Sequence, residues 1–381
     1  MKSWKNVITK QVFMNLNRTL FTIHSWFGLI TGIFLLMLGL SGSLLIFKDE
    51  LDRFLYPDLL TVRPQEKTLP LDSLYKITVK QYPNLDGVAW LNPAAPNDQA
   101  YQFRLYLNDG RLISYDLGAV AINQYTGNIL RQGRGDDLEV GWMEWLYQFH
   151  FSFHLGMPGA ASVALFGIAM LISVFTGLII YRKFIWKVIT FKVSFNRNNW
   201  RTISSYLHRT TGIWALPFNV VILFTGFWLN LFAFEKEVWK NEMVLTPPNT
   251  LVKASLDSMY AQALQKIPDL TPTYVYFPTQ PERTFSIRGI RKGQNHLSAG
   301  GNSVQFDGQS GQFLSQTTFE DLSLWRQTKA TFYPLHIGNF GGLVLKIFYV
   351  IIGLTPGLLS ITGFLLWWRR KKTFNVSFVK S

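Results

Sequence analysis

The sequence predicts a membrane protein in which four apolar helices form a bundle and a tandem duplication supplies two α+β domains. Three observations lead to this fold class. The 381 residues contain four long apolar runs, and a run of about 18 or more apolar residues is typical of a membrane helix. Hydrophobic residues make up 48% of the sequence and charged residues only 16%, which is low for a soluble protein. The third observation is that the second half of the chain repeats the first.

Histidines and glycines recur at fixed spacings in the two halves. The interval from His24 to Gly42 equals the interval from His208 to Gly226. In the same way, His150 precedes Gly177 by the interval that separates His336 from Gly363. Residues 24–183 therefore align with residues 208–369 almost without gaps. Each half has an even number of spans, so both halves have the same orientation across the membrane, as in parallel repeats.

The distribution of charge predicts which side each loop occupies. The net charge is +14, and three short segments hold 16 of the 37 Lys and Arg residues and none of the 23 acidic residues. These segments are 1–19, 182–209 and 369–381. Because basic residues concentrate in cytoplasmic loops, we expect both termini and the short loop in the cytoplasm. The two loops of about 100 residues are then expected outside the membrane.

The absence of cysteine narrows the chemistry. A chain without cysteine forms no disulfide, no thiolate-bound iron–sulfur cluster and no covalently attached haem. We therefore predict a multi-pass protein of the bacterial inner membrane, surrounded by lipid, with periplasmic loops. Its basic residues lie where membrane topology requires them, so we expect no nucleic-acid partner.

These observations divide the chain into five connecting parts and four spans. In order they are a cytoplasmic segment (1–20), the first span (21–47), a periplasmic domain (48–149), the second span (150–181), a basic cytoplasmic loop (182–206), the third span (207–234), a second periplasmic domain (235–335), the fourth span (336–368) and a cytoplasmic tail (369–381).

Each large loop has the pattern of a small α+β domain. In the first loop, a helix is predicted from Leu71 to Tyr82, where it ends because the next residue is proline. Alternating apolar and polar residues at 87–91 and 101–107 predict strands. The second loop repeats the start of the helix at Leu256–Tyr260, the place that the duplication predicts for it.

The four repeat-related histidines are candidate iron ligands. His24 and His208 are expected at the cytoplasmic ends of their helices, and His150 and His336 at the periplasmic ends. Facing helices of a bundle commonly hold cofactors, and imidazole is a normal axial ligand of haem iron. We therefore predict two non-covalent haem b groups, each bound by two histidines. His24 and His208 would ligate the inner haem, and His150 and His336 the outer one; the catalytic residues stay unidentified.

Alternatives to this assignment remain open. His154 lies one helical turn after His150 on the same face and could ligate the outer haem instead. Its repeat partner is Phe340, so the spacing favours His150. Histidines at helix ends can also be interfacial side chains that a duplication copied. A permease is disfavoured, because the apolar runs 21–47, 159–181, 211–234 and 343–368 contain no Asp or Glu and Lys346 is their one Lys or Arg. Ion-coupled transporters normally hold ionisable groups at mid-depth.

At these residues the chain resembles the PepSY-associated transmembrane family over nearly its whole length. The resemblance rests on four histidine motifs and on two loops that look like PepSY modules. The motifs are His24-x3-Gly28, His150-x5-Gly156-Met-Pro-Gly159, His208-Arg-Thr-Thr-Gly212 and Leu335-His336-Ile-Gly338-Asn-Phe-Gly341-Gly342. His154 departs from the family pattern, in which an apolar residue is usual at that position.

The family includes inner-membrane iron–siderophore reductases with two b-type haems. The resemblance therefore implies electron transfer from a cytoplasmic-side or quinol donor to a ferric siderophore in the periplasm. Reduction would release iron, because siderophore oxygens bind Fe(II), a softer ion, less tightly. Two other functions are compatible with the same features. One is a b-type cytochrome subunit that passes electrons to another protein, and the other is a membrane-anchored PepSY module that binds or regulates an envelope protein without enzymatic activity.

Overall fold

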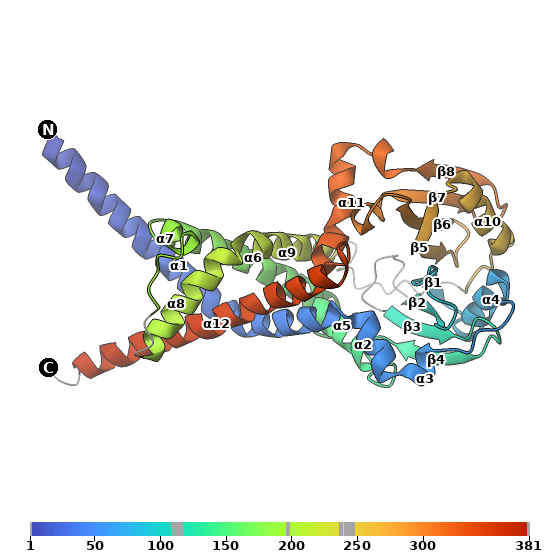
Figure 1. Ribbon diagram of the computed structural model, residues 1–381, viewed down its shortest axis with the longest axis horizontal. Coiled ribbons are helices and arrows are strands. Elements are labelled where there is room, and N and C mark those ends of the chain that lie inside the picture. The colour runs from blue at the N-terminus through green and yellow to red at the C-terminus, as the bar shows by residue number, and fades with distance from the viewer. Residues whose placement is uncertain (1, 108–116, 196–198, 236–238, 240–247, 379–381) are drawn as a thin grey trace. The chain divides into compact units, whose positions relative to one another are not determined.

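The computed structural model describes residues 2–107, 117–195, 199–235, 239 and 248–378 (Figure 1). The chain forms two compact units, which we call the helical unit and the sheet unit. The helical unit consists of Met1–Ile46, Ser162–Asn230 and Lys346–Ser381, and the sheet unit consists of Phe47–Ala161 and Leu231–Leu345.

Six helices in the described part of the chain contribute to the helical unit. They are α1 (Lys2–Leu45), α6 (Gly156–Tyr181), α7 (Ile185–Ile189), α8 (Trp200–Trp214), α9 (Leu216–Leu229) and α12 (Gly342–Phe378). Three stretches are long and apolar enough to cross a membrane, namely Leu16–Leu45, Gly156–Tyr181 and Gly342–Arg369. The pair α8 and α9 is a fourth candidate if it is counted as one bent span.

The third predicted span, 207–234, is bent rather than continuous. The axes of α8 and α9 differ in direction by 68°, and α9 ends at Leu229. The cause is Pro217, which lies in the first turn of α9. Proline has no amide hydrogen and its ring clashes with the preceding turn, so a helix ends just before it.

In the described residues the sheet unit contains eight strands in one antiparallel sheet, in the order β4-β3-β2-β1-β5-β6-β7-β8 (Figure 1). The strands are β1 (Leu85–Trp90), β2 (Tyr101–Leu107), β3 (Leu117–Ile122), β4 (Ile129–Arg134), β5 (Leu270–Phe277), β6 (Thr284–Arg291), β7 (Asn302–Asp307) and β8 (Phe313–Thr317). The α-helices are α2 (Lys48–Leu55), α3 (Pro57–Leu60), α4 (Leu71–Gln81), α5 (Trp142–Ser152), α10 (Leu256–Lys266) and α11 (Leu324–Ile337). Short 3-10 helices lie at η1 (Leu231–Phe234), η3 (His296–Ser298) and η4 (Phe319–Asp321).

The two loops that the sequence predicts as separate domains share this sheet. Each contributes one helix followed by four strands, and the two halves meet where β1 pairs with β5, with Val88 opposite Phe277. The predicted helix in the first loop is α4, and the predicted strands at 87–91 and 101–107 are β1 and β2. The strand pairing between the halves is the feature that the sequence pattern does not predict.

Asp72 and Asp257 connect the two halves by capping each other's helices. The carboxylate of Asp257 accepts hydrogen bonds from the amides of Leu71 and Asp72, at 2.9 and 3.1 Å. In return, the Asp72 carboxylate accepts from the amide of Leu256 at 2.9 Å. Each carboxylate therefore satisfies amides that the first turn of a helix leaves free, and its negative charge suits the helix dipole.

The two faces of the sheet carry different side chains, as the alternation of a strand requires. One face packs against α4 and α10 around an apolar core that includes Phe103 and Phe277. On the opposite face, Tyr106 belongs to a second cluster with Tyr147 and Phe151 of α5. This second face therefore meets the helix that carries His150.

The predicted spans 150–181 and 336–368 begin later in the structure than in the sequence-based division. His150 lies in α5 and His336 in α11, and α6 and α12 begin only after them. The residue after each of these shorter helices has a left-handed backbone, with φ of +50° and +67°. A left-handed residue ends an α-helix, so each histidine lies on a helix that precedes the apolar one.

Candidate functional site

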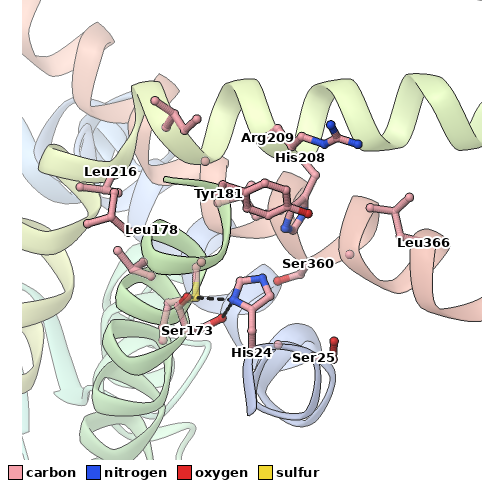
Figure 2. Close-up of a pocket in the computed structure, with 18 of the residues that line it drawn as sticks. His24, Ser25, Ser173, Leu178, Tyr181, His208, Arg209, Leu216, Ser360 and Leu366 are labelled. Carbon is pink, nitrogen blue, oxygen red and sulfur yellow. Dashed lines mark hydrogen bonds between the residues drawn. The ribbon is translucent and has the colours of Figure 1, made fainter. Parts of the chain in front are cut away.

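His24 and His208 face each other in the helical unit. His24 lies on α1 and His208 on α8, and Figure 2 shows their side chains pointing toward one another. Their ring centres are 6.1 Å apart, and the ring planes are nearly perpendicular at 86°. The structure therefore brings together the two histidines that the sequence predicts as the inner pair.

Hydrogen bonds assign the tautomer of both rings. His24 Nδ1 lies 2.9 Å from the carbonyl oxygen of Ser173; a carbonyl only accepts, so Nδ1 carries the proton. His208 Nδ1 lies 3.0 Å from Thr362 Oγ1, and that hydroxyl donates to the Leu358 carbonyl at 2.7 Å. The hydroxyl oxygen therefore accepts from His208 Nδ1. Both Nε2 atoms consequently hold the lone pair that a metal ligand needs.

Each ring also packs against a glycine of the facing helix. A Cβ atom added at Gly177 of α6 would lie 3.1 Å from His24 Cε1, and one added at Gly363 of α12 would lie 3.3 Å from His208 Cε1. Either contact would be tighter than about nine in ten real Cβ contacts, so the ring would have to move by a few tenths of an ångström. The two glycines are repeat-equivalent, so the two halves of the chain seat their histidines in the same way.

A cavity of about 310 Å³ lies beside this pair and is lined by α1, α6, α7, α8, α9 and α12. Its apolar lining includes Leu35, Met170 and Leu359, and its polar lining includes Arg209. A Cβ atom added at Gly28, which also lines the cavity, would meet nothing within 4 Å. The volume lies in the range of about 300–1,000 Å³ that is usual for ligand pockets.

His150 and His336 form a second pair, in the sheet unit. Their ring centres are 6.3 Å apart, with 44° between the planes. Burial, together with the neighbouring His336, lowers the pKa of His150 to about 3. The His150 ring is therefore neutral at physiological pH, the form that binds metals.

An arginine of the sheet interacts with tyrosines of the two helices that carry this second pair. Tyr147 and Tyr333 each precede one of the paired histidines by three positions, and the charge of Arg104 on β2 acts on both tyrosines. The Arg104 guanidinium lies 5.1 Å from the centre of the Tyr147 ring. Arg104 is partly buried, and the negative charge of Glu144 acts on it.

A buried charge network involves other side chains of the same helix, α5. Glu144 forms an ion pair with Lys48 and lies 3.9 Å from Arg131, whose Nη1 is 2.7 Å from Asp52 Oδ2. Burial opposes the charge of Glu144, but Lys48, Arg104 and Arg131 outweigh it and lower the pKa of Glu144 to about 2. The network therefore holds α5 to β4 and α2 through charged side chains.

His154 packs against aromatic side chains of α5. Its backbone is left-handed, with φ of +57°, and its ring centre is 4.5 Å from that of Trp145 and 5.9 Å from that of Phe149. The ring beside His336 is that of His150. The geometry thus favours His150 over His154 as the partner of His336, in agreement with the repeat spacing.

The donor set of both pairs fits a haem. Two imidazoles that bind one metal from opposite sides, each through a nitrogen about 2 Å away, have ring centres about 6 Å apart. The observed separations of 6.1 and 6.3 Å match this value. Among the described residues, no group of three or more His, Cys, Asp or Glu side chains could hold a metal ion. Two nitrogen donors suit a haem, because the macrocycle supplies the other four.

The sequence identifies the histidines but not the residues that orient them. Thr362 is visible in the sequence only as a repeat marker, because its contact with His208 depends on how α8 and α12 pack. Arg104 could have been identified from the sequence, since Arg288 occupies the equivalent position on β6 in the second half of the chain. A polar residue repeated on the same face of equivalent strands indicates a site rather than a core.

Comparison with known families agrees with these features. The model of the family described as PepSY-associated TM region matches residues 21–370, a stretch that contains both histidine pairs and nearly all of every candidate span. No curated protein gives a significant match. With its apolar helices, the chain is a multi-pass membrane protein of this class. The chain therefore belongs to the PepSY-associated transmembrane family.

Proposed function

We propose that this protein is a dihaem membrane reductase that transfers electrons to a ferric siderophore. His24 and His208 would bind the inner haem b, and His150 and His336 the outer one. The observation that carries the proposal is the geometry of the two pairs, whose ring centres lie 6.1 and 6.3 Å apart. His24 and His208 lie within α1 and α8 rather than at the helix ends that the sequence predicts. Idle histidines have no reason to adopt a metal-binding separation twice.

The residues around the inner pair support this assignment. Ser173 and Thr362 hold the Nδ1 atoms, so the Nε2 atoms are presented as ligands. The glycines under both rings let the imidazoles approach the facing helices closely. The cavity beside the pair is largely apolar, which suits the macrocycle of a haem. When bound, the haems would supply the one-electron redox chemistry, and the protein would set their position and environment.

The proposed membrane arrangement is a four-helix bundle that arose by tandem duplication. The bent pair α8 and α9 would count as one span, which makes four with the three continuous ones. Basic residues concentrate at both termini and in 182–209, which supports an inner-membrane topology with these parts in the cytoplasm. The sheet unit would then lie in the periplasm, and the two histidine pairs would lie toward opposite membrane surfaces.

The proposed reaction moves one electron at a time. An unidentified cytoplasmic-side or quinol donor would lose an electron, and the Fe(III) of the siderophore would gain it and become Fe(II). The weaker hold of siderophore oxygens on Fe(II) would release the ion. The guanidinium of Arg104, which lies 5.1 Å from the centre of the Tyr147 ring, is a positive charge of the sheet unit that would suit the anionic oxygens of such a substrate.

The test is reduction of a ferric siderophore by purified protein. Protein reduced with dithionite and freed of excess reductant is mixed with ferric siderophore and an Fe(II) chelator, and the coloured chelate is followed with time. We expect one Fe(II) for each electron held by the protein, and no reaction in His336→Ala. A haem-containing protein that forms no Fe(II) would instead support the cytochrome subunit. A protein that binds no haem would support the PepSY binding module.

A further inference from the structure

Arg209 lies next to His208 on α8 and lines the inner cavity, and Figure 2 shows it beside that histidine. Its guanidinium carbon is 5.6 Å from the centre of the Tyr181 ring, and it donates a hydrogen bond to Ser205 Oγ. The Nε atom of Arg209 is buried and has no hydrogen-bond partner among the described residues. The side chain is thus only partly satisfied by the protein.

No carboxylate of the helical unit can neutralise Arg209. The three segments that make up this unit, Met1–Ile46, Ser162–Asn230 and Lys346–Ser381, contain no Asp and no Glu. A charge removed from water is costly unless an opposite charge accompanies it. A molecule that fills the cavity and carries a negative charge would supply the counter-charge that this unit lacks.

A second arginine lies on the same side of the cavity. Arg201 also lines it and precedes His208 by about two helical turns, so the two side chains lie on the same face of α8. Arg201 is exposed. The apolar part of the lining includes Leu35 of α1, Met170 of α6 and Leu359 of α12. The cavity therefore combines an apolar body with a cationic edge on α8.

We infer that Arg209 and Arg201 bind the carboxylates of the molecule that fills this cavity. The inference rests on the proposed function, under which these carboxylates are the two propionates of the inner haem. A guanidinium binds a carboxylate with two parallel hydrogen bonds, and Arg209 Nε is available for one of them. The same two arginines would fix the orientation of the haem in the cavity.

The test compares haem with its dimethyl ester, which lacks both carboxylate charges. Full-length protein is produced without haem in the His336→Ala background, so that the inner site alone is titrated. We expect this protein to bind free haem at least about tenfold more tightly than the ester. Arg209→Gln should weaken binding of free haem by about tenfold and leave binding of the ester within about twofold. Arg182→Gln, at an exposed arginine outside the cavity lining, should change neither affinity.

The outcomes separate this inference from the proposed function. The inference would be overturned if Arg209→Gln preferred free haem over the dimethyl ester as strongly as its parent, the His336→Ala protein, does. The haem site itself would then still stand. Failure of the parent protein to bind either compound would overturn the proposed function itself. If the anion came from a lipid phosphate, free haem and ester would bind alike in the parent, which also overturns the inference. Should Arg209→Gln not fold, Arg209→Lys and Arg201→Gln are titrated in the same way, and an unchanged preference in both would refute the role.

Discussion

At the scale of single residues, the chain uses one arrangement twice. In both His24 and His208, Nδ1 donates a hydrogen bond to an oxygen of the facing helix, and the ring packs against a glycine of that helix. Gly177 and Gly363, which receive the rings, are equivalent under the repeat. Ring position is therefore set by packing between helices, and a small change at either glycine should act on the histidine rather than on the fold.

We expect Gly177→Ala to weaken haem binding at the inner site by about tenfold, because residues that orient a metal-binding histidine are typically worth this much. The new methyl group would lie 3.1 Å from His24 Cε1 and would displace the ring. Gly167→Ala, on the same helix, is the matched control, since its methyl group would make an ordinary 3.5 Å contact. Haem retention after gel filtration measures the difference, and equal retention in both variants would contradict the packing role.

Glu144 should stabilise the protein at neutral pH and cease to do so in acid. Its pKa is about 2 in the folded protein and about 4.3 in an unfolded chain, so its charge contributes about 3 kcal/mol above pH 4.3. This contribution is lost as the pH falls through 4.3 toward 2. Glu144→Gln should therefore be about 3 kcal/mol less stable than the wild type at pH 7, and the gap should close in acid.

Urea unfolding in detergent between pH 7 and 3 measures the difference in unfolding free energy between the wild type and Glu144→Gln. Glu139→Gln, at an exposed position, is the control and should leave the free energy of unfolding within about 0.5 kcal/mol of the wild type. A gap for Glu144→Gln that stayed constant over this pH range would show that the carboxylate charge is not what stabilises the network.

At the scale of elements, the sequence predicts helices better than their ends. The helix at Leu71–Tyr82 follows from its start and from the proline after it, and α4 confirms it. The apolar runs are also found as helices. The break before α6 cannot be predicted, because a left-handed φ at a non-glycine residue such as Phe153 has no sequence signal. His150 and His336 therefore lie on their own helices rather than on the spans.

The reciprocal caps at Asp72 and Asp257 should stabilise the junction between the halves of the sheet unit. Alanine at either position removes hydrogen bonds from the other half's helix start. We expect each substitution to lower the free energy of unfolding by about 1 kcal/mol. The loss of unfolding free energy in the double variant should differ from the sum of the two single losses, because the two side chains share one contact region.

Urea unfolding measures both capping variants, with Asp58→Ala, at an exposed residue of α3, as the control. The control removes a carboxylate without removing a cap, so it should behave like the wild type. If each single variant lost less than about 0.3 kcal/mol, which is below the usual cost of removing a cap, the capping role would be refuted.

At the scale of the whole molecule, the histidine pairs could be predicted and the joined sheet could not. Equivalent residues of the two halves are separated by a nearly constant number of positions, so the four histidines could be paired by comparing residue numbers. The pairing of β1 with β5 joins strands from opposite halves of the chain, and no local pattern reports such a contact. The sheet unit is accordingly a single structure made by both halves, and neither half should fold as it does here without the other.

The most direct measurement of the central claim is the number of haems per chain. Detergent-purified protein is analysed by pyridine haemochrome and by oxidised and dithionite-reduced spectra, together with His24→Ala, His336→Ala and His154→Ala. We predict two low-spin b-type haems in the wild type, one in each of the first two variants, and two in His154→Ala. A colourless wild-type protein, even after expression with added haem, would contradict the account, and loss of a haem in His154→Ala but not in His150→Ala would contradict the outer pair.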